Sequence, residues 1–527
     1  MRKGMENRRE NVLLFPFMAQ GHIIPFLALA QKIEKNGYSI TFVNTPLNIK
    51  KLQRSLPPGS FIKFVEIPFN STEHGLPPGA ENSDSLPYNL LFSLLQATLS
   101  FKIPFKKLLF DIIQEQGGVK PVCVIADFLF GWTADIAHEF GIFHSIFSAT
   151  GGFGTACYYS MWLNLPHKNI DGVFGKEGST VLDCIIKEEK LKSRSLYCPD
   201  VFSTECAEFL LPDFPEAGKH HVTQVSPAMK MAGENDPFTE YQWKNLSTWA
   251  NSDALLLNTV EELDKLGLMY FRRKLGIPVY AIGPVLLSEN VRSPRAGKEA
   301  TVSPDKWIEW LDKKEVKSVL YICFGSMNTI SASHMMQLAK ALDASGINFI
   351  WVVRPPIGFD INAKFVADKW LPEGFSDQER GLIVDTWAPQ VEILSHKSVA
   401  AFLSHCGWNS VLESLINGVP LISWPMAAEQ FHNAKFLVEE VGVCMEMARG
   451  TSFEVSQEDI IEKIEFFMGG NEKLKEIKGK SSEVEEIMKN AIRDEEIYKG
   501  SSVKAMEEFF KAALLIKGTK SQKVTNY

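Results

Sequence analysis

The stretch 387–430 gathers side chains that can hold and polarise a small molecule. It reads WAPQVEILSHKSVAAFLSHCGWNSVLESLINGVPLISWPMAAEQ. The apolar run VAAFLS leads into HCGWNS and then into the amphipathic VLESLING, which predicts a strand, a turn and a helix. Polar groups therefore collect at the carboxyl end of a strand, where open parallel sheets bind nucleotides.

The turn that follows this strand offers an anion site. Backbone N–H groups and the helix dipole favour negative charge at a helix N-terminus. Gly407 lets the backbone approach a phosphate closely, and His405, Asn409 and Ser410 can add side-chain donors. A second small-residue turn, FGS, ends another predicted strand and brings Ser326 within possible reach of the same phosphates.

Neighbouring residues suit a base, a ribose and a sugar. Trp387 offers a flat face, and backbone groups around Ala388 could read the edge of a base. Glu413 follows on the helix as a carboxylate for a ribose diol, and Glu429 and Gln430 supply groups for sugar hydroxyls. Each residue alone has an ordinary explanation, as a core tryptophan, a solvated carboxylate or a satisfied polar group. Their shared crevice favours nucleotide binding.

A candidate base lies in the first half of the chain. His22 sits in AQGHIIP, between the first predicted strand and helix, and Asp127 ends the strand VCVIAD. A neutral imidazole can take a proton from a hydroxyl. A carboxylate on its other nitrogen would fix the tautomer and stabilise the imidazolium. The alternative is that both residues are simple helix caps.

Aromatic residues of the first half are candidates for binding an apolar, planar ligand. The alternative, that they are core residues, should apply to about half of them. They are Phe17, Phe128, Phe130, Trp132, Phe147, Phe153 and Trp162. The segment 150–235, which is rich in aromatics and weakly periodic, suits the same kind of ligand.

The elements that must position these residues form an α/β fold. At 527 residues, the chain is too long for one core. Apolar runs alternate with helical patterns, which predicts two doubly wound parallel sheets. We expect a domain at 1–284, a linker at 285–304, a domain at 305–500 and a helix end with a disordered tail at 501–527. Predicted strands are 12–17, 39–45, 62–69, 122–130, 143–148, 253–259, 278–284, 318–326, 348–354, 382–389, 399–405 and 419–425.

Composition excludes several classes of protein. The net charge of −8 disfavours a nucleic-acid partner. Eight cysteines without a CxxC pair indicate reduced, buried thiols, and no spacing typical of a metal site is present. No signal peptide or membrane span is evident. We therefore expect a cytoplasmic monomer with no metal.

The 387–430 stretch resembles the 44-residue signature of plant family-1 UDP-dependent glycosyltransferases. The match runs from WAPQ, through HCGWNS and Glu413, to the acidic residue before Gln430 and Gln430 itself. The resemblance extends over nearly the whole chain. It implies the GT-B fold, with two Rossmann-like domains facing across a cleft.

The resemblance also implies roles for these residues. By this resemblance, the base and ribose would be bound by Trp387, Ala388, Gln390 and Glu413. The diphosphate would be bound by His405, Asn409, Ser410 and Ser326, and the transferred sugar by Trp408, Glu429 and Gln430. The histidine of the AQGH turn would be the base, with Asp127 as its partner. Gln430 at the end of the box favours UDP-glucose as co-substrate, and no other cofactor is implied.

The implied reaction is inverting O-glucosylation of a small hydrophobic plant metabolite, most readily a flavonoid or another phenolic. Another UDP-sugar or a terpenoid acceptor is the alternative. A Rossmann oxidoreductase or epimerase would need a G-x-G-x-x-G turn, which neither half has at its first turn. A silent UDP-sugar-binding protein would have lost His22 or Asp127, and both are present.

Overall fold

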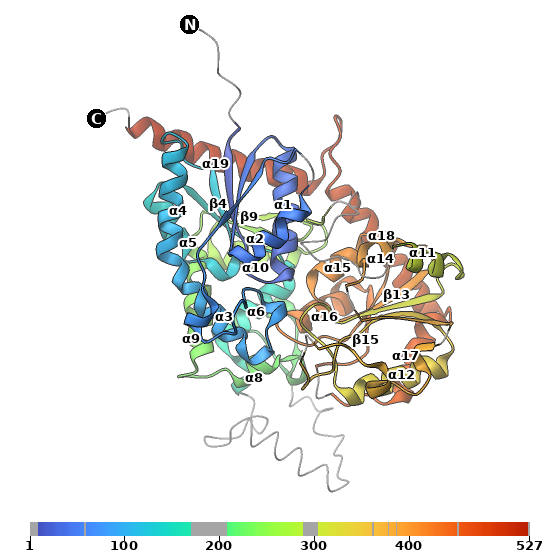
Figure 1. Cartoon of the computed structure of the whole chain (residues 1–527). Helices are drawn as coiled ribbons and strands as arrows, with labels where there is room; N and C mark the ends of the chain where they lie inside the picture. The colour runs from blue at the N-terminus through green and yellow to red at the C-terminus, as the bar shows by residue number, and fades with distance from the viewer. Residues whose placement is uncertain are drawn as a thin grey trace.

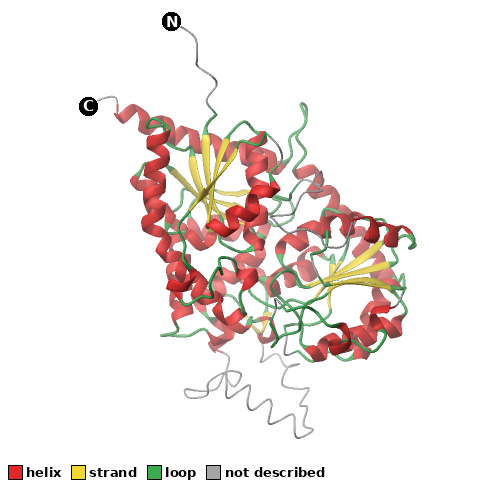
Figure 2. Ribbon diagram, in the orientation of Figure 1, coloured by secondary structure: helices red, strands yellow, loops and turns green. Residues whose placement is uncertain are grey.

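Two α/β domains lie side by side in the computed structural model, the first blue to green and the second yellow to red in Figure 1. The structure describes residues 9–56, 59–169, 208–287, 304–360, 363–377, 379–385, 387–450 and 453–524. Helices flank the strands of both sheets (Figure 2). This arrangement confirms the predicted α/β class with two Rossmann-like domains.

In the described part of the first domain, seven parallel strands pair in the order β3-β2-β1-β4-β5-β8-β9. They are β1 (Asn11–Phe15), β2 (Ser39–Asn44), β3 (Ile62–Glu66), β4 (Cys123–Asp127), β5 (Phe143–Ser148), β8 (Ala254–Leu257) and β9 (Val279–Ala281). The central strands are buried along their whole length. This is why they read as continuous apolar runs rather than alternating ones.

The second sheet has six parallel strands in the described chain, in the order β12-β11-β10-β13-β14-β15. They are β10 (Val319–Cys323), β11 (Asn348–Val352), β12 (Gly381–Val384), β13 (Val399–Ser404), β14 (Leu421–Ser423) and β15 (Cys444–Glu446). The sequence does not predict β15, because a three-residue edge strand ending in Glu446 has too little apolar pattern to stand out.

The helices cover the faces of the two sheets. Those of the first domain are α1 (Gln20–Lys35), α2 (Pro46–Leu52), α3 (Leu91–Ala97), α4 (Lys102–Glu115), α5 (Thr133–Glu139), α6 (Gly152–Asn164), α8 (Pro227–Met231), α9 (Pro237–Ser247) and α10 (Lys265–Leu275). Those of the second are α11 (Pro304–Asp312), α12 (Ala332–Ser345), α13 (Ala367–Trp370), α14 (Gln390–Ser395), α15 (Trp408–Leu415), α16 (Gln430–Lys435), α17 (Gln457–Met468) and α18 (Glu472–Ala491). None of the described helices is long and apolar enough to cross a bilayer.

Helix α6 corrects the prediction that 150–235 is irregular. Almost all of its residues are buried, so its sequence shows no polar face and no helical periodicity. The reason is its position between the first sheet and the second domain, where Phe153 stacks on Phe436 with ring centroids 5.2 Å apart. Residues 170–207 of that segment lie outside the described residues, as do 288–303 of the expected linker.

The end of the chain also differs from the prediction. Helix α19 (Ser501–Val524) continues through most of the segment expected to be disordered, and only 525–527 lie outside the described residues. It returns across the first domain (Figure 1). Phe509 packs on Phe143 at 5.6 Å and Phe510 stacks on Tyr38 at 4.4 Å between ring centroids. Burial of these rings stabilises the predicted helix end, and the polar residues 518–524 continue it as helix.

The described cysteines agree with the prediction of buried thiols. They are Cys123, Cys157, Cys323, Cys406 and Cys444, all free and buried. Cys184, Cys198 and Cys206 lie outside the described residues.

Candidate active site

A histidine and an aspartate meet at the carboxyl edge of the first sheet. His22 lies in the first turn of α1, and Asp127 is the last residue of β4. The His22 Nδ1 atom is 2.8 Å from the Asp127 Oδ2 atom. Backbone N–H groups of Phe17 and Leu129 also donate to this carboxylate, at 3.2 and 3.1 Å. Asp127 therefore caps the turn after β4 and holds the imidazole at once.

The surroundings of His22 favour its protonated form. Burial alone would lower the pKa of His22, but the Asp127 carboxylate and the more distant Glu429 carboxylate raise this pKa above its ordinary value. Since Asp127 accepts the Nδ1 proton, the Nε2 lone pair remains available for a proton from another group. The side chain of His22 is 21% exposed, whereas that of Asp127 is fully buried. This is the geometry of a general base with a fixed tautomer.

The second domain brings three of the predicted polar residues together. Gln390, at the start of α14, donates from Nε2 to the Ser410 hydroxyl at 2.9 Å and to the Glu413 carboxylate at 2.8 Å. The Tyr321 hydroxyl donates to the Gln390 carbonyl oxygen at 3.2 Å. Ser410 and Glu413 are one turn apart on α15 and are both buried. These hydrogen bonds fix the Glu413 carboxylate near the N-terminus of α15.

The backbone at Gly325 and at Gly407 approaches the His405 ring so closely that there is no room for a Cβ atom. A Cβ atom on Gly325 would be 2.6 Å from the His405 Nε2 atom, and one on Gly407 would be 2.4 Å from it. Gly325 also has a φ of +82°, which disfavours any other residue. Burial lowers the pKa of His405 to about 4, so the ring is neutral at pH 7. No side chain caps the N-terminus of α15, and its N–H groups remain open to an anion.

The remaining donor-side residues lie at the same sheet edge. Trp387, half-buried, and Ala388, buried, precede α14 after the end of β12. Gln430 begins α16 after β14, and its carbonyl oxygen accepts the N–H groups of Met426 and Ala427, each at 3.0 Å. This bonding fixes the amide of Gln430 and leaves its nitrogen for a further partner.

Glu429 connects this edge to the first domain. Its side chain is half-buried, and burial raises its pKa, an effect that His22 partly opposes. Because each group shifts the pKa of the other, the Glu429 carboxyl group lies near the His22 imidazole. One predicted sugar-side residue is therefore close to the predicted base.

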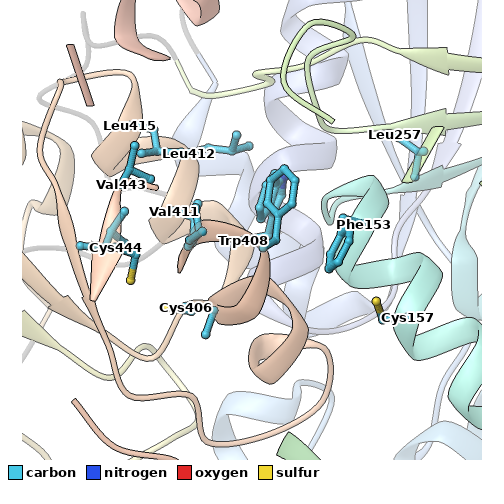
Figure 3. Close-up of a cluster of buried hydrophobic side chains, with 14 of the residues drawn as sticks. Phe153, Cys157, Leu257, Cys406, Trp408, Val411, Leu412, Leu415, Val443 and Cys444 are labelled. Carbon is cyan, nitrogen blue, oxygen red and sulfur yellow. The ribbon is translucent and has the colours of Figure 1, made fainter. Parts of the chain in front are cut away.

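Two adjacent residues of the HCGWNS turn cross between the domains. The Asn409 amide donates to the carbonyl oxygen of Gly21 at 2.9 Å, one residue before His22. The Trp408 indole N–H donates to the carbonyl oxygen of Asn258 at 2.6 Å, and a Cβ on Gly151 would be 2.7 Å from the ring. Figure 3 shows the indole between the second domain and α6. The side chain of Trp408, predicted to contact the sugar, thus fills the domain interface.

The predicted aromatic residues divide into two groups. The rings of Phe17 and Phe128 approach the His22 ring, with centroids 5.4 and 5.3 Å away. The other five are buried among neighbouring side chains of the first domain and its interface with the second. These five are Phe130, Trp132, Phe147, Phe153 and Trp162. Their burial agrees with the core interpretation.

One charged residue escaped prediction. Arg354, at the end of the run NFIWVVR, donates to the carbonyl oxygen of Ser326. Its guanidinium is desolvated, and this lowers its pKa from the ordinary value. The signal was available, because an arginine at the carboxyl end of a parallel strand lies at the edge where anions bind.

Comparison with known proteins identifies the family. A family model described as UDP-glucoronosyl and UDP-glucosyl transferase matches residues 294–482. UDP-glycosyltransferase 92A1 of Arabidopsis thaliana is 45% identical over 522 residues, covering 97% of this chain and 98% of that protein. The chain belongs to the plant family-1 UDP-glycosyltransferases. As a member of this family, the enzyme takes a UDP-sugar as co-substrate and acts on plant secondary metabolites.

Other similarities agree with this assignment. The scopoletin glucosyltransferase of Nicotiana tabacum is 34% identical to this glycosyltransferase, over 81% of each chain. The crystal structure of Glycyrrhiza uralensis UGT73P12 with glycyrrhetinic acid 3-O-monoglucuronide superimposes with a TM-score of 0.78 at 26% identity, covering 98% of each chain. The fold of the enzyme is GT-B.

Replacing Gly325 by alanine should weaken UDP binding. The new Cβ forces the turn after β10, or His405, out of position. Backbone strain of this kind costs about 1–3 kcal/mol, and we expect a roughly 10-fold higher Kd for UDP by isothermal titration calorimetry. The matched control is Gly346→Ala, which has a similar φ of +67° but would bring its Cβ no closer than 3.6 Å to Arg380. Equal losses in both variants would mean that Gly325 does not shape the anion site.

Proposed function

We propose that this enzyme is an inverting UDP-glucose-dependent O-glucosyltransferase for a small hydrophobic plant metabolite. The observation that carries the proposal is the His22–Asp127 pair, held at 2.8 Å at the edge of the first sheet, with Glu429 of the second domain near enough to raise the pKa of His22. A proton acceptor thus lies near a residue suited to hold a sugar. That arrangement fits transfer better than binding alone.

His22 would start the reaction. Its Nε2 atom removes the proton from the acceptor hydroxyl while that oxygen attacks the anomeric carbon. Asp127 keeps the Nδ1–H in place and stabilises the imidazolium as it forms. The Glu429 carboxylate, whose charge also favours the protonated ring, assists. The attack comes from the face opposite UDP, so an α-linked donor gives a β-glucoside.

The second domain would receive the leaving group. As the bond between the anomeric carbon and oxygen breaks, its electron pair passes to the diphosphate of UDP. The open N–H groups at the start of α15, with the side chains of Ser410 and Ser326, suit that charge. His405, kept neutral by burial that lowers its pKa to about 4, would hold the two glycine turns in place beside the diphosphate. The Arg354 guanidinium behind Ser326 adds positive potential.

The remaining donor contacts follow from position. We assign Trp387 and Ala388 to the uracil, and Glu413 with Gln390 to the ribose hydroxyls. The hydrogen bond from Gln390 fixes the orientation of the Glu413 carboxylate. The amide nitrogen of Gln430 is the sugar contact, since its carbonyl oxygen is occupied by the loop. This pattern supports glucose as the transferred sugar.

The acceptor would lie against Phe17 and Phe128, whose rings flank His22. Aromatic faces beside the base favour a planar, apolar molecule with a reactive hydroxyl. Flavonoids and other phenolics have this shape. Among relatives, one is named scopoletin glucosyltransferase and another anthocyanin 3'-O-beta-glucosyltransferase.

A screen with UDP-glucose tests the proposal directly. UDP release is measured with phenolic and terpenoid acceptors, and each product is analysed by NMR for its anomeric configuration. We expect β-glucosides with phenolic acceptors. A folded enzyme that binds UDP but transfers glucose to no member of the panel would contradict the proposal, as would an α-linked product.

The Asp127→Asn variant should lose activity and change its pH profile. In the wild type, kcat/KM should fall on the acid side with a midpoint above pH 6.5, because Asp127 and Glu429 raise the pKa of His22 and protonation removes the base. Without the carboxylate this midpoint should move to lower pH, and the plateau should fall roughly 100-fold or more. Asp253→Asn, which alters a second histidine–aspartate pair at 2.9 Å, is the control and should keep the wild-type profile. An unmoved midpoint in Asp127→Asn would remove His22 from the role of base.

Gln430→Glu tests the sugar contact. The new carboxylate keeps an oxygen for the N–H groups of Met426 and Ala427 but loses the amide donor. We expect kcat/KM for UDP-glucose to fall about 10-fold or more, because a sugar hydroxyl loses its partner. Affinity for UDP, which lacks the transferred glucose, should stay unchanged. Equal losses for UDP and UDP-glucose would show that the variant disturbs the loop instead.

A further inference from the structure

A buried cluster of one thiol and two imidazoles joins the domains away from the catalytic residues. Cys157 comes from α6, His220 from β7 (His220–His221), and His432 from α16 of the second domain. One potential ligand atom from each side chain lies within 4.8 Å of the other two. Cys157 and His220 are fully buried and His432 is 3% exposed. The sequence gives no hint of this cluster, since the three residues are far apart along the chain.

The hydrogen bonds of the two histidines leave nitrogen atoms without partners. His220 Nδ1 lies 3.2 Å from the carbonyl oxygen of Gly218, so this nitrogen carries the proton and Nε2 has the lone pair. Neither His220 Nε2 nor His432 Nδ1 has a hydrogen-bond partner, although both atoms are buried. Such groups are costly to leave unsatisfied. A backbone carbonyl on the second nitrogen is also how proteins orient a metal-binding histidine.

We propose that Cys157, His220 and His432 form a binding site for one divalent cation of the zinc type. One thiolate and two imidazoles are the ligands that such a cation prefers. Usual zinc–ligand distances correspond to ligand separations of about 3.4–3.6 Å, so the three side chains would close in by roughly 1 Å. Binding releases the Cys157 thiol proton to solvent as the metal–sulfur bond forms. A water molecule completes the tetrahedron.

The charges around the cluster are compatible with a cation. Lys435, one turn along α16 from His432, is a positive group beside the cluster, and it is paired with the carboxylate of Glu439.

The position of the site suggests its effect. Figure 3 shows Cys157 on the face of α6 that carries Phe153, next to the second domain. A bound ion would connect α6 and β7 of the first domain to α16 of the second. Helix α16 begins at Gln430, so the ion would also steady the sugar-side loop, a consequence that rests on the proposed role of Gln430. The ion is structural in this account and takes no part in glycosyl transfer.

Cobalt spectroscopy of the chelator-treated full-length protein tests the proposal. One equivalent of Co²⁺ should give a thiolate-to-cobalt charge-transfer band in the near ultraviolet and the strong visible bands of a tetrahedral ion, and added Zn²⁺ should abolish both. Cys157→Ala should remove the charge-transfer band. His220→Gln and His432→Gln should each weaken Co²⁺ binding at least about 10-fold. The control Cys123→Ala, at another fully buried thiol, should keep the wild-type spectrum.

Melting temperature provides the second measurement. Zn²⁺ should raise the melting temperature of the wild type, because a ligand that binds only the folded state stabilises it. The melting temperature of His432→Gln should not rise. A wild-type protein without a charge-transfer band, or a Cys157→Ala variant that retains it, would overturn the proposal. Both measurements are independent of transferase activity, so failure here leaves the proposed reaction untouched.

Discussion

The contact between the HCGWNS turn and the first domain is the constraint on which the site depends. The base and the anion cradle belong to different sheets, and reacting groups must be positioned to within about 1 Å. Trp408 and Asn409 supply that positioning by donating to the carbonyl oxygens of Asn258 and Gly21. The same turn exposes the N–H groups of α15. One short segment therefore carries the proposed diphosphate site and sets its distance from His22.

Packing elsewhere supports this contact. Phe153 of α6 stacks on Phe436, so a continuous apolar core runs from the first domain into the second. At the other side, α19 returns to the first domain, where the Ser501 hydroxyl donates to Glu262 at 2.9 Å. The chain therefore crosses between the domains twice. Relative movement of the domains must preserve both the α6 interface and the packing of α19.

Much of this arrangement could be predicted from the sequence, for physical reasons. Buried parallel strands are uniform apolar runs, so most strands were located to within a few residues, and the polar residues at their carboxyl ends marked the edges where the cleft forms. Helix α6 is not predicted because burial on all sides erases amphipathic periodicity, and the end of α19 over 518–524 is not predicted because these polar residues carry no helical pattern. Trp408 shows the same limit at the site, since only the fold reveals that its indole packs against Gly151 at the domain interface. Cys157, His220 and His432 could not be associated by any local pattern.

The central claim is that the two domains divide the work, with donor binding in the second and proton removal in the first. The most direct measurement compares UDP-glucose affinity with glucose transfer in His22→Ala. The contact of Asn409 is with the backbone of Gly21, so it survives the truncation. The account predicts an unchanged Kd for UDP-glucose by calorimetry and a rate of transfer at least about 100-fold lower. Loss of UDP-glucose binding together with transfer, or transfer that persists at the wild-type rate, would contradict it.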